Sequence, residues 1–251
     1  MNGFERHAIN HSSASSINLW QNAPDVFIAE KLFGLRGRMS PAALRGIEIE
    51  KAIVRVLMRE CDIETSIGMA IHSFNLQTAL QGGDKIDKER ECIDPAVRIG
   101  VGELSQYGKP EFAADGKQNR IELLCNGEGW SLPIVGYLDL VYPQHGLVVD
   151  IKTTLKAPTE MSDEHQRQAA IYRKASGNSA VKFLYLTPKK AVWHECADVD
   201  GTLAEIKTIL TRQEHFLRQG SKEELAKLVH FNRGAFYWNG NEENRKAVYG
   251  I

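Results

Sequence analysis

The chain has 251 residues, of which 43% are hydrophobic and 25% charged, and its formal net charge is −1. A chain of this length and composition can build a sizeable apolar core, so its fold needs no disulfide or metal ion as a staple. The near-zero charge argues against a polycation that coats nucleic acid, but it does not exclude a nuclease, in which only one face has to be basic.

The four cysteines are far apart in the chain and form no Cys-x-x-Cys pair; they are Cys61, Cys92, Cys125 and Cys196. Zinc and iron–sulfur sites have tighter spacing, so we predict reduced, mostly buried thiols. Residues 1–16 contain no apolar run of signal-peptide length, and no later stretch reaches the roughly 18 apolar residues of a membrane span. These patterns predict a soluble cytoplasmic protein without a membrane segment.

Residues 12–112 carry a mainly helical pattern. The serine run Ser12–Ser16 offers helix-capping hydroxyls ahead of the apolar anchor Trp20, and Pro24 predicts a turn between two short helices. The glycine- and arginine-containing stretch Gly34–Arg38 predicts an exposed loop.

A longer helix is predicted over Pro41–Cys61, because Ser40 can cap its N-terminus and apolar residues recur at helical spacing. These apolar residues are Leu44, Ile47, Val54 and Leu57. Two further helices are predicted over Ile67–Leu80 and Pro95–Tyr107, with a loop near Gly82-Gly83 between them.

The middle of the chain has a β pattern. Strands are predicted over Arg120–Cys125, Ile134–Tyr142 and Leu147–Thr153, and turns at Gly127–Gly129 and Pro143–Gly146 separate them. The short connections predict an antiparallel meander of three strands.

The remaining sequence alternates between helix and strand. We predict a helix over Ser162–Ala175, strands over Val181–Thr187 and Ala191–Cys196, a helix over Thr202–Gln219, and another helix that begins with a capping box at Ser221.

This order of elements predicts an α/β (α+β) fold with a central mixed β-sheet flanked by helices. We expect one domain over residues 1–251, with a mainly helical part at 12–112, the sheet core at 119–196, and helices with a tail at 198–251.

Three charged residues interrupt the two most apolar strands. Asp150 and Lys152 are two residues apart and face the same side of their strand, and Asp139 on the antiparallel neighbour can lie beside them. Charges on a largely buried sheet are costly unless they pair with one another or with a cation. Paired carboxylates favour a hard divalent metal that activates water, and Lys152 would orient that water or help to deprotonate it. The alternative is an Asp150–Lys152 ion pair on a solvent-facing strand, since Asp-x-Lys is a common tripeptide.

Three motifs in this order resemble the PD-(D/E)xK nuclease superfamily, and in particular its RecB-like exonuclease branch. They are Gly136-x-x-Asp139, Asp150-x-Lys152 and Gln168-Ala-Ala-Ile-Tyr172. The resemblance spans the chain from Ser12 to Lys190 and implies a restriction-endonuclease-like core around the mixed sheet.

Two motifs in the N-terminal half extend the resemblance. They are Ser15-Ser16-Ile17 with Trp20 and Pro24, and Arg45-Gly46-x-x-x-Glu50. The second resembles the Arg-Gly-x-x-x-His helix of the branch, whose last residue ligates metal. Glu50 replaces that histidine, which is similar to phage lambda-type exonucleases, and a carboxylate suits Mg²⁺ or Mn²⁺. This departure puts the metal preference in question.

The resemblance implies a role for each site residue. One or two Mg²⁺ or Mn²⁺ ions would be held by Glu50, Asp139, Asp150 and the carbonyl of Ile151. The catalytic set would be Lys152, Asp150, Asp139, Glu50, Gln168 and Tyr172. DNA would be contacted by Arg45, Gln168, Tyr172 and Lys156. Further basic candidates are Arg36, Arg38, Lys189 and Lys190.

Several of these assignments have a plainer alternative. Gln168 and Tyr172 also fit one face of an ordinary amphipathic helix. Glu48 competes with Glu50 as the acid that faces the site, and Arg45 could pair with a neighbouring glutamate instead of a phosphate.

We therefore expect a metal-dependent DNA exonuclease that hydrolyses phosphodiester bonds in phage-type recombination or DNA repair. The alternatives are a structure-specific endonuclease on the same fold and a catalytically silent nuclease-like DNA-binding domain, although the intact set of three acids and one lysine argues against the silent domain. The resemblance also implies DNA as a partner, a recombination partner such as a single-strand annealing protein, a homo-oligomer as in ring-shaped lambda-type enzymes, and the host cytoplasm if a phage encodes the chain.

Overall fold

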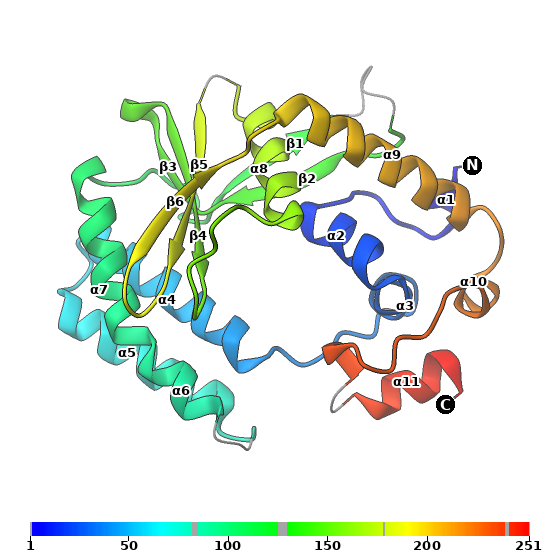
Figure 1. Ribbon diagram of the computed structural model, residues 1–251, viewed down its shortest axis with the longest axis horizontal. Coiled ribbons are helices and arrows are strands. Elements are labelled where there is room, and N and C mark those ends of the chain that lie inside the picture. The colour runs from blue at the N-terminus through cyan, green and yellow to red at the C-terminus, as the bar shows by residue number, and fades with distance from the viewer. Residues whose placement is uncertain (1, 82–84, 125–129, 178, 239–240, 251) are drawn as a thin grey trace.

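The computed structural model describes residues 2–81, 85–124, 130–177, 179–238 and 241–250. The described part of the chain is a mixed α/β structure, in which helices cover both faces of a central sheet (Figure 1). This arrangement confirms the predicted fold class. The predicted loop at Gly82-Gly83 and the predicted turn at Gly127–Gly129 lie outside the described residues.

The central sheet has four strands in the order β3-β4-β5-β6. These strands are β3 (Leu140–Tyr142), β4 (Leu147–Thr153), β5 (Ala180–Leu186) and β6 (Ala191–Glu195). Strand β4 pairs antiparallel with β3 and parallel with β5, and β5 pairs antiparallel with β6. The sheet is therefore mixed, as the sequence predicts, because helix α8 (Asp163–Ala175) provides the crossover between the two parallel strands.

The predicted strand Ile134–Tyr142 is wrong as one continuous element. The chain bends at Asp139, so that β2 (Ile134–Leu138) pairs with β1 (Asn119–Leu123) in a separate two-stranded ribbon while β3 joins the main sheet. At the bend, the Asp139 carboxylate accepts a hydrogen bond from the backbone N–H of Ile151 on β4. This side-chain bond links Asp139 directly to β4 at the break between the two ladders.

Helices α4, α5 and α7 cover one face of the sheet, at the left of Figure 1. The helices of this segment are α4 (Pro41–Leu57), α5 (Ile63–Thr78), α6 (Lys85–Glu91) and α7 (Ile93–Leu104), followed by the 3₁₀ turn η2 (Ser105–Tyr107). Ser40 caps α4 through a bond to the N–H of Ala43, as predicted. The helix ends at Leu57 instead of Cys61, because Arg59 adopts a left-handed backbone conformation with φ of 60°. Helix α6 was not among the predicted elements.

The other face is covered by α2, α8 and α9. The N-terminal elements are α1 (Gly3–Arg6), α2 (Ala14–Asn22), α3 (Pro24–Phe27) and the π-helix η1 (Ile28–Leu32). The Ser13 hydroxyl caps α2, and Pro24 occupies the first position of α3, so the predicted pair of short helices is confirmed. Trp20 packs against Phe27 and Phe216 in this part of the core.

The C-terminal segment packs back onto the N-terminal helices, at the lower right of Figure 1. Helix α9 (Val199–Leu217), at the upper right of Figure 1, precedes this segment, whose own elements are α10 (Lys222–Leu228), the 3₁₀ turn η4 (Phe236–Trp238) and α11 (Glu242–Tyr249). The indole N–H of Trp238 donates to the buried Asp25 carboxylate at 2.9 Å, and the Tyr249 hydroxyl donates to the Asp25 carbonyl at 2.8 Å. A buried acid on α3 therefore anchors the tail.

Side chains of β4 alternate between the two faces of the sheet. Val149 and Ile151 belong to the core under α4, α5 and α7, whereas Val148 belongs to the core under α2, α8 and α9. By the same alternation, Asp150 and Lys152 face α8.

None of the described helices is both long enough and apolar enough to cross a membrane. The 3₁₀ turn η3 (Pro143–His145) connects β3 to β4.

Candidate functional site

Asp150 and Lys152 form the centre of the site on β4. The Lys152 Nζ lies 2.6 Å from Asp150 Oδ1, and the Asp150 side chain is almost wholly buried, with 1% of its surface exposed. The ammonium also lies over the Phe183 ring, 5.2 Å from the ring centroid. The structure thus places the predicted pair on one face and removes its acid from solvent, unlike an ion pair on a solvent-facing strand.

Asp139 approaches this pair from the bend between β2 and β3. Its Oδ2 accepts the N–H of Ile151 at 3.0 Å, and its Oδ1 accepts the side-chain amide of Gln118 at 2.9 Å. The hydrogen bond to β4 brings the second acid next to Asp150, as the antiparallel pairing predicts. The Ile151 carbonyl as a metal ligand stays a prediction.

Glu50 reaches the same place from α4. The Gln118 Nε2 donates to Glu50 Oε1 at 2.9 Å as well as to Asp139, so the two carboxylate oxygens lie within two hydrogen-bond lengths of each other. Glu48 points elsewhere, because its buried carboxylate accepts from Gln77 on α5 and pairs with Lys51. Of the two glutamates, Glu50 is therefore the one at the site.

The three acids carry more negative charge than their surroundings compensate. Burial, and next the charge of Asp150, raise the pKa of Glu50 to about 7. Burial, followed by the charges of Asp150 and Glu50, holds the pKa of Asp139 well above its ordinary value. The pKa of Asp150 is raised by burial even though the Lys152 ammonium opposes the shift. Crowded carboxylates of this kind favour a bound cation or a proton.

The donor chemistry of these residues fits a hard divalent cation, which prefers carboxylate oxygens. Within the part of the chain that the structure describes, however, no three His, Cys, Asp or Glu side chains converge closely enough to ligate one metal ion directly. The side-chain amide of Gln118 lies between Glu50 and Asp139 in this arrangement.

Gln168 and Tyr172 of α8 support Asp150 from the opposite side. Gln168 Nε2 donates to Asp150 Oδ2 at 2.8 Å and to the Tyr172 hydroxyl at 2.9 Å, and that hydroxyl donates to the Tyr137 carbonyl at 2.7 Å. These bonds join α8, β4 and β2 in one network. The two residues therefore face the site and not the solvent side of an ordinary amphipathic helix.

Gly136 makes room for this network. A Cβ at this position would lie 2.7 Å from Cε1 of Tyr172, closer than side chains approach one another. The glycine of the Gly136-x-x-Asp139 motif thus allows the Tyr172 ring to lie against β2 and reach the carbonyl of the next residue.

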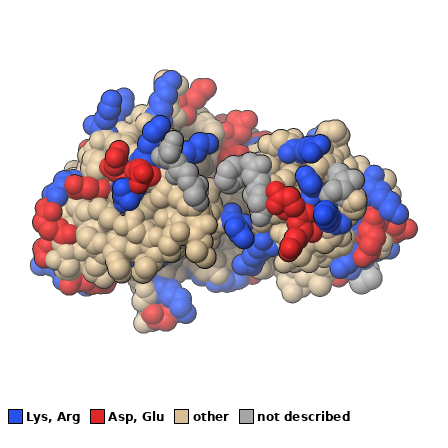
Figure 2. Space-filling model, turned by 90° about the horizontal axis from the view of Figure 1, so that it is seen from below, with Lys and Arg blue, Asp and Glu red and all other residues tan. Residues whose placement is uncertain are grey.

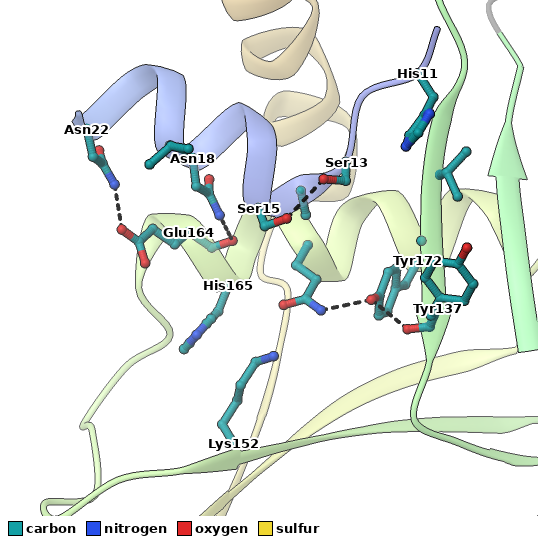
Figure 3. Close-up of a pocket in the computed structure, with 15 residues that line it drawn as sticks. His11, Ser13, Ser15, Asn18, Asn22, Tyr137, Lys152, Glu164, His165 and Tyr172 are labelled. Atoms are coloured by element: carbon teal, nitrogen blue, oxygen red, sulfur yellow. Dashed lines mark hydrogen bonds between the residues drawn. The ribbon is translucent and has the colours of Figure 1, made fainter. Parts of the chain in front are cut away.

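Two adjoining hollows open beside Lys152. One has a volume of about 670 Å³ and is lined by α2, β2 and α8, including Ser15, Asn18 and Tyr137. The second, of about 810 Å³, lies toward Lys156 and Tyr185, and both hollows share Lys152 and His165. Figure 3 shows the Lys152 side chain extending from β4 toward α8 and His165. A substrate in either hollow would lie against the ammonium.

His165 lies between the two hollows with a fixed ring orientation. Its Nδ1 lies 2.7 Å from the Tyr185 hydroxyl. Burial, and next the charge of Lys152, lower the pKa of His165 to about 4, so its imidazole is neutral at pH 7. The site therefore presents the Lys152 ammonium next to a neutral histidine.

The predicted DNA contacts divide into two groups. Lys156 is exposed and lines the second hollow, so its prediction stays open. The assignment of Arg45 to DNA needs correction, because this side chain is 4% exposed and pairs with Glu89 while it donates to the Thr153 carbonyl. Glu89 lies on α6, the helix that the sequence pattern does not predict, so Arg45 pairs with an acid of another helix instead of a phosphate or a neighbouring glutamate.

The other basic candidates lie on the surface. Arg36 and Arg38 are exposed on the connector between α3 and α4, and Lys189 and Lys190 are exposed at the turn before β6. Figure 2 shows basic side chains in the waist between the two halves of the molecule, on the side along which the α3–α4 connector runs in Figure 1.

Two polar groups at the site have no sequence signal. Gln118 lies in an irregular segment before β1, where no periodicity marks an inward-facing side chain. The Tyr137 carbonyl belongs to the backbone, and only the close approach of Tyr172 gives it a role. A glycine three residues before Asp139 is the one available clue to that approach.

No protein-family model matches the sequence, and no curated protein does. Among solved structures, the chain is similar to one described as "Crystal structure of SSO0001", with a TM-score of 0.34 and 15% sequence identity over 64% of this chain and 74% of the other. A likeness of this size carries no argument about fold or function.

Proposed function

We propose that this protein is a metal-dependent DNA exonuclease that hydrolyses phosphodiester bonds with Mg²⁺ or Mn²⁺. One observation carries the proposal: Glu50, Asp139 and Asp150 come from a helix, a bend and a strand to one partly buried place, with the Lys152 ammonium beside them. A bound divalent cation supplies neutralisation of the acids and of the phosphate, and it lowers the pKa of a water molecule.

The protein side chains have separable tasks in this proposal. Asp139 and Asp150 would hold the cation, and Glu50 would join them once the Gln118 amide no longer lies between Glu50 and Asp139. Burial raises the pKa of both aspartates, and the charges of Asp150 and Glu50 add to the shift of Asp139, so a cation would relieve part of this cost. Lys152 would place positive charge next to the phosphate oxygens as negative charge develops on them. Gln168 would keep the Asp150 carboxylate in a fixed orientation, because its amide donates to Oδ2 and is itself held by Tyr172.

The surroundings of Lys152 suit a polar, anionic substrate. Serine, asparagine and tyrosine side chains line the first hollow, and Lys156 adds a second ammonium at the other. DNA as the substrate, the preference for chain ends, and a role in recombination with an annealing partner or a homo-oligomer rest on the resemblance to RecB-like and phage-type exonucleases.

Cleavage assays on DNA of different topology test the proposal. End-labelled linear DNA and covalently closed circles, each single- and double-stranded, are incubated with Mg²⁺, Mn²⁺ or EDTA. We expect metal-dependent loss of the linear substrates, which Asp150→Asn or Lys152→Ala abolishes. Asp200→Asn and Lys207→Ala, which change exposed residues on α9, are the matched controls and should cut like the wild type.

Two results would redirect the proposal. Cutting of closed circles would identify a structure-specific endonuclease on the same scaffold. Wild-type protein that binds DNA but cuts none of the substrates in any metal would identify a catalytically silent domain.

A further inference from the structure

Gln118 connects two of the three acids through a single atom. Its Nε2 donates to Glu50 Oε1 and to Asp139 Oδ1, both at 2.9 Å. An amide NH₂ group has two hydrogens, so each carboxylate takes one of them and the donor capacity of the group is used up. The NH₂ group thus lies between two carboxylates that belong to distant parts of the chain.

An amide NH₂ in this position resembles a weak cation. Its hydrogens carry partial positive charge, and hydrogen bonds to ionised carboxylates are the stronger kind. The hydrogen bond from Gln118 lowers the pKa of Glu50 against the larger opposing effects of burial and of Asp150. A divalent ion shared by Glu50 and Asp139 would need the oxygens that Gln118 now bonds.

The segment that carries Gln118 leaves its side chain room to move. Residues 114–117 form an exposed turn closed by backbone bonds between Ala113 and both Gly116 and Lys117. Gln118 itself is half-buried and lines a hollow of about 480 Å³ together with Glu50 and Lys51. A rotation of the side chain toward this hollow would free both carboxylate oxygens without a change in the sheet.

We propose that Gln118 is a built-in competitor of the metal ion, which bridges Glu50 and Asp139 until a divalent cation displaces its amide. Gln118 is then a positioning residue that sets the metal affinity, since every binding event has to break two charge-assisted hydrogen bonds. The same bridge keeps the two acids close to each other before the cation arrives. This inference rests on the metal-dependent function proposed above.

Isothermal titration with Mn²⁺ tests the proposal without a nuclease assay. The variant Gln118→Met keeps the length of the side chain but has no N–H to donate. We expect it to bind Mn²⁺ at least about tenfold more tightly than the wild type, because a tenfold factor corresponds to only one of the two charge-assisted hydrogen bonds that the wild type has to break. Gln144→Met, which changes an exposed glutamine that donates to the Tyr107 carbonyl, is the matched control and should bind like the wild type.

A second measurement follows Gln118 directly. In ¹⁵N-labelled protein, Mg²⁺ should shift the side-chain NH₂ resonances of Gln118 toward those of solvent-exposed glutamines. Binding by Gln118→Met that is unchanged or weaker than the wild type would overturn the proposal, and weaker binding would show that the amide supports the metal site instead of competing for it.

The same titrations separate this inference from the proposed function. Wild-type binding that Asp150→Asn abolishes but Gln118→Met leaves unchanged would remove the role of Gln118 and keep the metal site. If neither the wild type nor the Gln118→Met variant binds Mn²⁺, both the role of Gln118 and the proposed metal-dependent function are ruled out.

Discussion

The substitution Glu50→Gln should stabilise the protein above pH 7 in the absence of divalent cations. The pKa of Glu50 is raised from 4.5 to about 7 by burial and by the charge of Asp150. A tenfold change in an ionisation constant corresponds to about 1.4 kcal/mol, so the ionised carboxylate lowers the free energy of unfolding by about 3 kcal/mol. Glutamine keeps an oxygen for the Gln118 amide but cannot ionise.

The pH dependence gives this prediction its sign. The pKa of Glu50 is higher in the folded state than in the unfolded state. Below the unfolded pKa of about 4.5 the carboxyl is protonated in both states and the free energy of unfolding is unaffected. As the pH rises toward and through about 7, ionisation favours the unfolded state and the free energy of unfolding falls. The variant should therefore match the wild type near pH 4.5, and the difference should grow to about 3 kcal/mol above pH 7.

Urea denaturation in EDTA at several pH values measures this difference. Glu60→Gln, which changes an exposed acid beyond the end of α4, is the control and should have no comparable pH dependence. With Mn²⁺ present the order should reverse, because the wild type gains binding free energy that the variant loses. A variant that is no more stable than the wild type at pH 8 would refute the electrostatic account of the site.

Three further substitutions test how the surroundings hold the site. Gly136→Ala should push the Tyr172 ring from its place, lower the free energy of unfolding by about 1–3 kcal/mol in urea denaturation, and slow DNA cleavage; wild-type stability would contradict the contact. Arg45→Met should lower the free energy of unfolding by about 3–5 kcal/mol in the same assay, because Glu89 loses its partner, and the double variant with Glu89→Met should recover part of this loss. Trp238→Ala should cost about 3–5 kcal/mol and expose the tail to limited proteolysis, and an unchanged digestion pattern would show that the tail docks without it.

Sequence patterns predicted those features that depend on contacts between residues close together in the chain. Ser40 and Ser221 begin helices because their hydroxyls bond N–H groups three residues ahead, and the structure shows both caps. Strand β4 runs from Leu147 to Thr153 as predicted, and the two-residue period of a strand puts Asp150 and Lys152 on one face.

Features that depend on contacts between distant parts of the chain were not predicted from these patterns. At the bend, Asp139 accepts a hydrogen bond from β4, while the apolar sequence around it is equally compatible with an unbroken strand. Helix α6 has no buried residues, so it lacks the apolar stripe that predicts a helix, yet it carries the partner of Arg45.

The amino-acid sequence by itself determined most of the helices and strands in their order, the start of α4, both ends of β4, and the shared face of Asp150 and Lys152, because hydrogen bonds and side-chain periods over a few residues decide these features. Only the tertiary structure decided that Glu50 rather than Glu48 faces the acids, and that Gln118, 68 residues further along the chain, joins it to Asp139. The physical reason is that a helix can turn either carboxylate inward until the packing of α4 against its neighbours selects one.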